Sequence, residues 1–252
     1  MTYAPVVLFV YNRLEHTRKT VESLLANKEA IRTPLYIYSD AAHDIIETNS
    51  VEHVRDYIHT IQGFDEVIII ERETNFGLAA SIISGVTKLC DEYGRVIVLE
   101  DDLEVSPYFL KYMNDALNRY ANSEHVCSIS GYMYPIDLEI DEGTFFYSAP
   151  HSWGWATWKR AWDLFDDNGE VLLQKISDAG LGCAFEKNGP HSYLKMLMAQ
   201  IRGENSSLYI RWYASCFLHK KLTLMPSTSL VQNIGIDGSG VHCANWKYNP
   251  FL

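Results

Sequence analysis

The first hundred residues alternate between short apolar runs and segments with helical spacing, and this alternation restricts the fold more than any other feature. The apolar runs are rich in β-branched residues and are expected as buried strands at residues 5–11, 34–39, 66–70 and 96–99. Helical spacing is found between them, at residues 14–27, 49–61 and 78–90. A βαβαβαβ order with short connections predicts a parallel sheet with helices on both faces.

The fourth predicted strand runs directly into three acidic residues, Glu100, Asp101 and Asp102. Adjacent carboxylates repel one another, and each is costly to remove from water. A cation or sugar hydroxyls above the strand would relieve both costs, and carboxylate oxygens suit Mg²⁺ or Mn²⁺, which also bind diphosphates. A solvated acidic loop is the alternative. Ser106 and Pro107 are expected to begin the next helix, as N-cap and first helical residue.

Polar residues also follow the other predicted strands: Arg13 after the first, Asp40 after the second, and Asn75 and Gly77 after the third. In open α/β sheets, ligands bind beyond the carboxyl ends of the strands. Because loops are polar in most proteins, this coincidence favours a nucleotide site without establishing one.

The net charge and the cysteine content indicate which partners and which cellular compartment suit this chain. The net charge of −11 argues against a nucleic-acid partner, although a metal could offset the charge of a nucleotide. No apolar run approaches the roughly 20 residues that span a bilayer, and no signal peptide is expected. Five widely spaced cysteines without a Cys-x-x-Cys pair are typical of reduced thiols, which predicts a cytoplasmic protein.

The second half of the chain is less regular. Strands are expected at residues 126–130, 145–148, 222–225 and 230–232, and helices at 193–201 and 208–219, with a polar, partly helical and mobile segment at 163–190. Trp155, Trp158 and Trp162 have the spacing of one helix face and are predicted to pack in the core. Trp153 and Gly154 are the better candidates for stacking on a sugar. No linker or repeat interrupts the chain, which predicts a single domain.

The glycine-rich segment 233–243 surrounds Asp237 and His242. Its composition is that of a loop able to close over a ligand, or equally of a solvated turn.

Together these residues resemble the GT-A nucleotide-sugar glycosyltransferases, above all the animal N-acetylglucosaminyltransferase I family. Residues 98–107 are similar to the acidic metal-binding motif of that family, and residues 5–13 to its opening strand. Ser39-Asp40 with His43-Asp44 is similar to its second-strand loop, and residues 146–162 to its acceptor-side segment. Residues 75–79 also resemble a loop of the bacterial family 2 transferases. The likeness covers most of residues 5–165.

The resemblance implies a GT-A, Rossmann-like α/β fold with a central, mostly parallel sheet, and a role for each matching residue. Asp102 would coordinate Mn²⁺ or Mg²⁺, Asp101 would face the ribose, and Glu100 would contact a hydroxyl of the transferred sugar. The remaining donor-binding residues implied by the matching loops are Arg13 on the diphosphate, Asp40 on the uracil of a UDP donor, Tyr11, Asn75, Gly77, and His242 on the metal or a phosphate.

The sequence differs from the pattern of this family at the position of the catalytic base. The family places an aspartate between two tryptophans, but the matching residues 208–212 contain no carboxylate. An inverting transferase needs a group that accepts the proton of the acceptor hydroxyl. Glu204 and Asp237 are the candidates for that role, and a relative without activity is the alternative.

The prediction is therefore a single GT-A-like domain, with a donor half at residues 1–122 and an acceptor half at 123–252. It would transfer a sugar from a nucleotide-sugar, UDP-sugar first, to a glycan or other hydroxyl acceptor, in bacterial-type surface glycan synthesis. One alternative is a sugar nucleotidyltransferase, although residues 12–15 lack the Gly-rich basic loop such enzymes carry. The other is a sugar- or nucleotide-binding protein that has lost catalysis.

Overall fold

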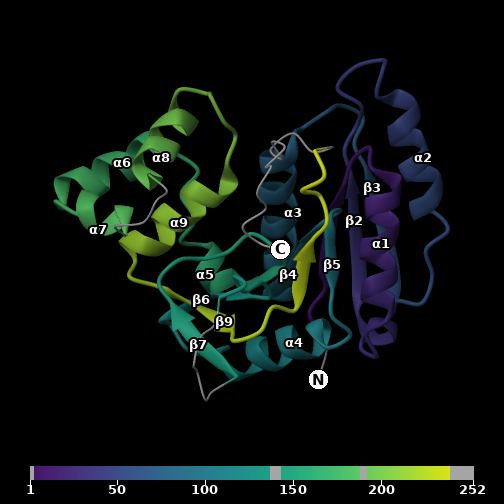
Figure 1. Ribbon diagram of the computed structural model, residues 1–252, viewed down its shortest axis with the longest axis horizontal. Coiled ribbons are helices and arrows are strands. Elements are labelled where there is room, and N and C mark those ends of the chain that lie inside the picture. The colour runs from purple at the N-terminus through teal and green to yellow at the C-terminus, as the bar shows by residue number, and fades with distance from the viewer. Residues whose placement is uncertain (1–2, 137–142, 188–191, 239–252) are drawn as a thin grey trace.

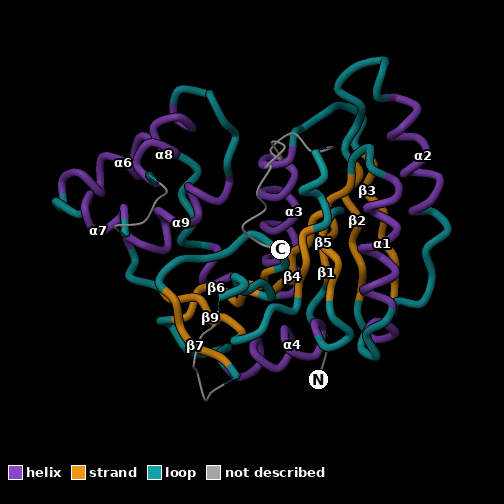
Figure 2. Tube along the Cα trace, in the orientation of Figure 1, coloured by secondary structure: helices purple, strands orange, loops and turns teal. Residues whose placement is uncertain are grey.

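The computed structural model describes residues 3–136, 143–187 and 192–238. Its centre is an eight-stranded sheet with the strand order β3-β2-β1-β4-β8-β6-β9-β7 (Figures 1 and 2). The alternating first part comprises β1 (Val6–Val10), α1 (Leu14–Leu25), η1 (Ala30–Arg32), β2 (Pro34–Ser39), α2 (Thr48–Ile58), β3 (Glu66–Glu71), α3 (Leu78–Tyr93) and β4 (Arg95–Glu100). Every element predicted for this part is present, and the α/β class is confirmed.

Strands β1 to β4 are parallel, with β1 between β2 and β4. Helices α1 and α2 lie side by side, and α3 packs against β1 and β4 on the other side of the sheet (Figure 1). The chain therefore changes direction across the sheet between β1 and β4. A crevice opens beyond the strand ends at such a switch point, and ligands of α/β proteins bind there.

The second half of the chain extends the sheet with β6 (Val126–Ser130), β7 (Thr144–Tyr147), β8 (Trp155–Trp158) and β9 (Leu222–Pro226). The helical interpretation of the tryptophan segment is wrong, because Trp155 and Trp158 belong to a strand. This strand is antiparallel to β4 on one side and to β6 on the other, so both of its edges are paired. The core prediction is confirmed: Trp155, Trp158 and Trp162 are at most 5% exposed.

The segment after the acid triplet also differs from the prediction. Residues Leu103–Val105 form β5, which pairs antiparallel with β10 (Val231–Asn233), and α4 (Phe109–Arg119) begins only at Phe109. Ser106 N still donates to Leu230 O at 2.8 Å, which keeps the chain extended through Ser106. Ser106 therefore heads a turn, with its carbonyl accepting from Phe109 N at 2.9 Å, and is not the N-cap.

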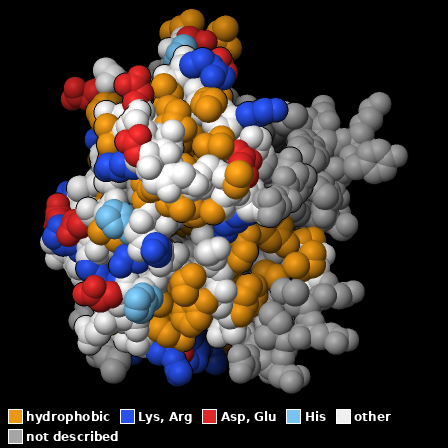
Figure 3. All heavy atoms as spheres, turned by 90° about the vertical axis from the view of Figure 1, so that its left-hand side faces the viewer, with side chains coloured by type: hydrophobic (Ala, Val, Ile, Leu, Met, Phe, Trp, Pro, Cys, Tyr) orange, Lys and Arg blue, Asp and Glu red, His pale blue; other side chains and the backbone are white. Residues whose placement is uncertain are grey.

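The remaining helices are α5 (Lys159–Trp162), α6 (Gly169–Asp178), α7 (Gly182–Glu186), α8 (Tyr193–Ile201) and α9 (Leu208–Leu218). They lie beside the second half of the sheet, with α6 to α9 gathered in one group (Figures 1 and 2). Helices α6 to α9 enclose a core of their own, in which Phe185 stacks on Tyr213 with ring centroids 4.7 Å apart. Seen from this side, acidic and basic side chains are interspersed among hydrophobic ones (Figure 3). The single-domain organisation stays a prediction.

Two further expectations can be examined within the described residues. None of the helices found there is long and apolar enough to cross a bilayer. Cys90, Cys127, Cys183 and Cys216 are all free thiols, although the sulfurs of Cys127 and Cys216 lie 3.2 Å apart.

Candidate functional site

Arg13 and the acid triplet meet at the switch point of the sheet. Because Phe9 of β1 is paired with Glu100 of β4, both strands end at the same level and the residues that follow them come together. Arg13 Nη2 donates to Asp101 Oδ1 and, at 2.9 Å, to Asp102 Oδ2. Asp101 is 4% and Asp102 8% exposed, so this is a buried cluster of two carboxylates around one guanidinium.

Burial and mutual repulsion shift the acid groups away from their ordinary pKa values. Burial, with the charges of Asp102 and Asp101, raises the pKa of Glu100 to about 8. Burial also raises the pKa of Asp101 to about 6, although the charge of Arg13 acts in the opposite direction. Burial lowers the pKa of Arg13, but the charges of Asp101 and Asp102 outweigh it and raise the pKa. Burial and the charges of Asp101 and Asp102 both favour the protonated form of Glu100 and so limit the negative charge of the cluster.

The donor atoms of the cluster fit a divalent cation that shares its coordination with a substrate. Asp101 Oδ2 is buried and has no hydrogen-bond partner within the described part of the chain. Three or more metal-binding side chains do not converge anywhere among the described residues. Mg²⁺ and similar ions are commonly held by one or two carboxylates, with substrate phosphates and water completing the shell. Asp101 and Asp102 suit that kind of site.

Helix α1 presents a polar face to the triplet. Thr20 Oγ1 donates to Asp101 O at 2.8 Å, and His16 Nε2 lies 3.1 Å from Asp237 Oδ2. Sequence reasoning missed both residues. His16 and Thr20 are four residues apart on one face of α1, directly after Arg13, a spacing that could have revealed them.

The segment after β10 lies against the triplet. Ile234 N donates to Asp102 O at 2.9 Å, and Gly235 N donates to Asn233 Oδ1 at 2.8 Å. A Cβ atom at Gly235 would lie 2.2 Å from Asp102 Oδ2, so only glycine allows this approach. The same turn brings Asp237 to His16 of α1. The remaining candidate of this segment, His242, lies outside the described residues.

Asp40 is bound to the loop that follows β3. Its carboxylate accepts from Phe76 N and from Gly77 N, each at 2.9 Å, while Asn75 Nδ2 donates to Ala41 O at 2.6 Å. Gly77 has a φ of +73°, which favours glycine at this position. These bonds explain why the polar residues that follow β2 and β3 are found together. The contact of Asp40 with a uracil ring stays a prediction.

Tyr11 belongs to a second network at the end of β1. Its hydroxyl donates to Glu47 and accepts from His43 N at 2.9 Å, and Glu47 also accepts from Asn12 Nδ2 at 3.0 Å. Burial and the Glu47 contact raise the pKa of Tyr11 to about 12. Glu47 therefore holds the β1 end against α2, a role that no local sequence signal indicates.

Glu204 is not brought to the cluster by any of the described contacts. It lies between α8 and α9, is exposed, and accepts two hydrogen bonds from Arg202, at 2.6 and 2.8 Å. The bonds from Arg202 lower the pKa of Glu204. A carboxylate with a lowered pKa that is already paired is a weaker base, which argues against the proposed role of Glu204.

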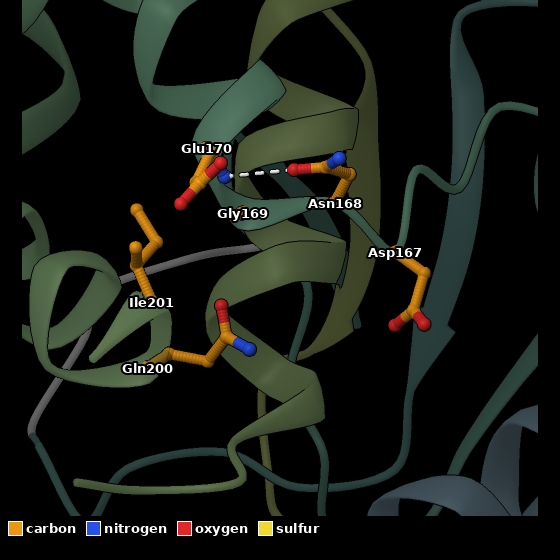
Figure 4. A pocket seen from close by; sticks show the side chains of 6 residues that line it. All are labelled: Asp167, Asn168, Gly169, Glu170, Gln200 and Ile201. Atoms are coloured by element: carbon orange, nitrogen blue, oxygen red, sulfur yellow. Dashed lines mark hydrogen bonds between the residues drawn. The ribbon is translucent and has the colours of Figure 1, made fainter. Parts of the chain in front are cut away.

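Two of the cavities lined by described residues can be compared with the predicted site. One, of about 420 Å³, lies between the start of α6 and the end of α8 (Figure 4), where the Gln200 side chain points toward Gly169. Its lining contains none of the predicted site residues. The other, of about 620 Å³, is lined by the residues that follow β6, by Trp153 and by residues of β10. It is the cavity that adjoins the segment covering Asp102.

Known proteins resemble parts of this chain. The model of the GNT-I family matches residues 1–134. An Arabidopsis thaliana alpha-1,3-mannosyl-glycoprotein 2-beta-N-acetylglucosaminyltransferase is 24% identical over 141 residues, which cover 52% of this chain. The matched region spans only 31% of that relative.

Two solved structures are similar to this chain at lower sequence identity. A mannosyltransferase from Pyrobaculum calidifontis, in complex with GDP-Man and Mn²⁺, has a TM-score of 0.43 and 10% identity, with 87% of this chain and 74% of that chain covered. TarS of S. aureus has a TM-score of 0.37 and 14% identity, with 56% of this chain and 23% of that chain covered.

Proposed function

Because this chain belongs to the GNT-I family, whose model matches residues 1–134, we propose that it is a glycosyltransferase that moves a sugar from a nucleoside diphosphate to a hydroxyl group. The observation that carries the proposal is the cluster of Arg13 with Asp101 and Asp102 at the switch point of the sheet. A guanidinium and two carboxylates there offer one group for phosphate oxygens and others for a cation and ribose hydroxyls.

Each residue of the cluster has a proposed task. Asp102, with Asp101 beside it, would hold Mn²⁺ or Mg²⁺. When bound, such a cation offsets the charge that develops on the leaving diphosphate. Arg13 would exchange a carboxylate for a diphosphate oxygen, since guanidinium groups bind both kinds of anion. Glu100, whose pKa burial raises, would contact a hydroxyl of the transferred sugar.

The donor is proposed to be a UDP-sugar. Support comes from the position of Asp40 at the end of β2, next to the loop that holds Asn75 and Gly77. Tyr11 and its partner Glu47 border the same strand ends. A role in bacterial-type surface glycan synthesis, in the cytoplasm, is proposed from the likeness of residues 75–79 to the bacterial transferases and from the free thiols.

Asp237 is the proposed catalytic base for an inverting transfer. It lies on the segment that covers Asp102, and His16 Nε2 is 3.1 Å from its carboxylate. Deprotonation of the acceptor hydroxyl by Asp237 would let that oxygen attack the donor sugar as the diphosphate leaves.

A catalytically inactive binding protein is the second candidate. One observation favours it: the stretch that matches the family's base region is core, with Trp212 packed against Trp155 and Trp162, and Arg211 paired with Asp167. That stretch, residues 208–212, contains no carboxylate that could accept the proton of an acceptor.

Thermal unfolding with UDP, GDP, CMP and dTDP, each with and without Mn²⁺, tests donor binding. A ligand that binds only the folded protein stabilises it by about 2.7 kcal/mol at a hundredfold excess over its Kd. We expect a shift of the unfolding midpoint that requires both UDP and Mn²⁺. In a separate turnover assay, we expect the protein to release UDP from UDP-sugars. Binding without turnover would favour the inactive candidate, and no shift with any nucleotide would refute donor binding.

A further inference from the structure

The cavity of about 620 Å³ is connected to the acid cluster through one strand. Gln232 and Asn233 of β10 line the cavity, and on its other edge β10 pairs with β5, so that Asn233 is opposite Leu103. The next residue, Ile234, donates to the carbonyl of Asp102 at 2.9 Å. A molecule in this cavity would therefore be bound next to the segment that covers the proposed donor site.

The lining combines aromatic rings with uncharged polar groups. Tyr132, Tyr134 and Trp153 supply the rings, and Thr228, Gln232 and Asn233 supply hydroxyl and amide groups. None of the described residues that line the cavity carries a charge. Its volume falls within the roughly 300–1,000 Å³ of typical small-molecule sites. A charged ligand would find no counter-ion here, whereas a neutral ligand with apolar faces and hydroxyls would find both kinds of contact.

The rings are held rigidly by one another. The Trp153 and Tyr132 centroids are 4.6 Å apart at an interplanar angle of 75°, and Tyr132 also meets Tyr134 edge to face at 5.4 Å. His151 lies behind them, with its ring 5.5 Å from Trp153 and Nε2 3.1 Å from the Tyr134 hydroxyl. A platform that is already ordered loses little conformational entropy when a ligand stacks on it.

We propose that this cavity binds the acceptor, and that the acceptor is a neutral pyranoside. One face of a sugar ring carries C–H groups that pack on aromatic rings, and its rim carries hydroxyls for the Gln232 and Asn233 amides. The assignment rests on the proposed function, since the cavity is an acceptor site only if a donor binds at the acid cluster. It predicts weaker binding of phosphorylated and acidic acceptors, for which the described part of the lining offers no cation.

Saturation-transfer difference NMR on the full chain, with and without UDP and Mn²⁺, tests the proposal. The probes are methyl α-D-mannopyranoside, methyl β-D-galactopyranoside and methyl N-acetyl-β-D-glucosaminide, with glucose 6-phosphate as the charged probe. The variants are Trp153→Ala, which removes a ring, and Thr228→Trp, which fills the cavity from an exposed position. Tyr108→Ala is the matched control, because Tyr108 is an aromatic residue with 70% exposure that does not line the cavity.

We expect at least one neutral glycoside to bind, and both cavity variants to weaken that binding tenfold or more. Tyr108→Ala should not alter it, and UDP affinity should stay within twofold in all three variants. Loss of folding in Trp153→Ala leaves Thr228→Trp as the deciding variant. The proposal is overturned if no glycoside binds in either condition, if Thr228→Trp leaves binding unchanged, or if only glucose 6-phosphate binds.

Two outcomes separate this proposal from the proposed function. Glycoside binding that responds to Thr228→Trp, without any UDP binding, would refute the transferase and with it the acceptor role. UDP binding that is lost in Thr228→Trp would assign the cavity to the donor, and would overturn the acceptor proposal alone.

Discussion

Arg13 Nη2 lies 2.9 Å from Asp102 Oδ2 and also donates to Asp101, so a single guanidinium is bonded to two buried carboxylates that follow a different strand. This contact joins the ends of β1 and β4 across the switch point. It also supplies the positive charge without which Asp101 and Asp102 would repel one another in a poorly solvated space. A ligand that binds here has to rearrange this contact.

Removal of the guanidinium should destabilise the fold. In Arg13→Gln the two buried carboxylates lose their counter-ion, and we expect a loss of about 3 kcal/mol in the free energy of unfolding. Urea unfolding at pH 7 measures it. Arg202→Gln is the control, because the Arg202–Glu204 pair is exposed and such pairs contribute little. Equal losses in the two variants would contradict the stabilising role of Arg13.

Asp102→Ala should abolish Mn²⁺-dependent nucleotide binding while the protein stays folded. Arg13 retains Asp101 as a partner in this variant, so no buried cation is left alone. Calorimetric titration of UDP, with and without Mn²⁺, measures the effect, which should exceed tenfold with Mn²⁺ present. Asp115→Ala, at an exposed ion pair with Lys111, is the control. If Asp102→Ala binds UDP and Mn²⁺ as tightly as the wild type, the assignment of the metal site is wrong.

Gly235→Ala should displace the segment that covers the acid cluster. A methyl group would lie 2.2 Å from Asp102 Oδ2 and 2.8 Å from its Cγ, so either the segment or the carboxylate has to move. We expect a destabilisation of about 1–3 kcal/mol and a severalfold weaker UDP affinity. Gly143→Ala is the matched control, since a Cβ there meets no atom of the described residues within 4 Å. A wild-type unfolding midpoint and UDP affinity in Gly235→Ala would show that the segment does not rest on Asp102.

His151 should make stability depend on pH between about 6.5 and 4. Burial lowers the pKa of His151 to about 4, so the unfolded chain takes up this proton at a higher pH than the native protein. The stability that depends on neutral His151 is fully present above pH 6.5. It is lost as the pH falls, by at most about 1.4 kcal/mol per pH unit. Urea unfolding of wild type and His151→Gln from pH 7.5 to 4.5 gives the difference. Parallel pH profiles would refute the lowered pKa.

The two candidate bases can be separated by their variants. Asp237→Asn should lower the rate of transfer at least a hundredfold with little change in UDP affinity, as expected for loss of a general base. Glu204→Gln should stay within twofold of the wild type, because Glu204 is paired with Arg202. Steady-state UDP release with a bound glycoside as acceptor measures both. The opposite pattern would assign the base to Glu204.

The sequence by itself determined the elements of the first hundred residues and the edge of the sheet at which the polar residues gather. Strand β2 has the predicted bounds, and Glu100 to Asp102 follow β4 as expected. These features follow from local information: the spacing of apolar residues distinguishes strand from helix, and the βαβ rule aligns the strand ends. The pairing of β1 with β4 then brings Arg13 to the triplet.

Only the tertiary structure decided the features that depend on distant partners. Trp155 and Trp158 have helical spacing, yet β4 and β6 pair with both edges of that segment and make it a strand. The β5–β10 pairing keeps Ser106 extended and brings Ile234 and Gly235 to Asp102, from the far end of the described chain. The cavity beside Trp153 is closed by the same strand. Backbone hydrogen bonds between distant segments leave no periodic signal in either segment, so local patterns cannot predict them.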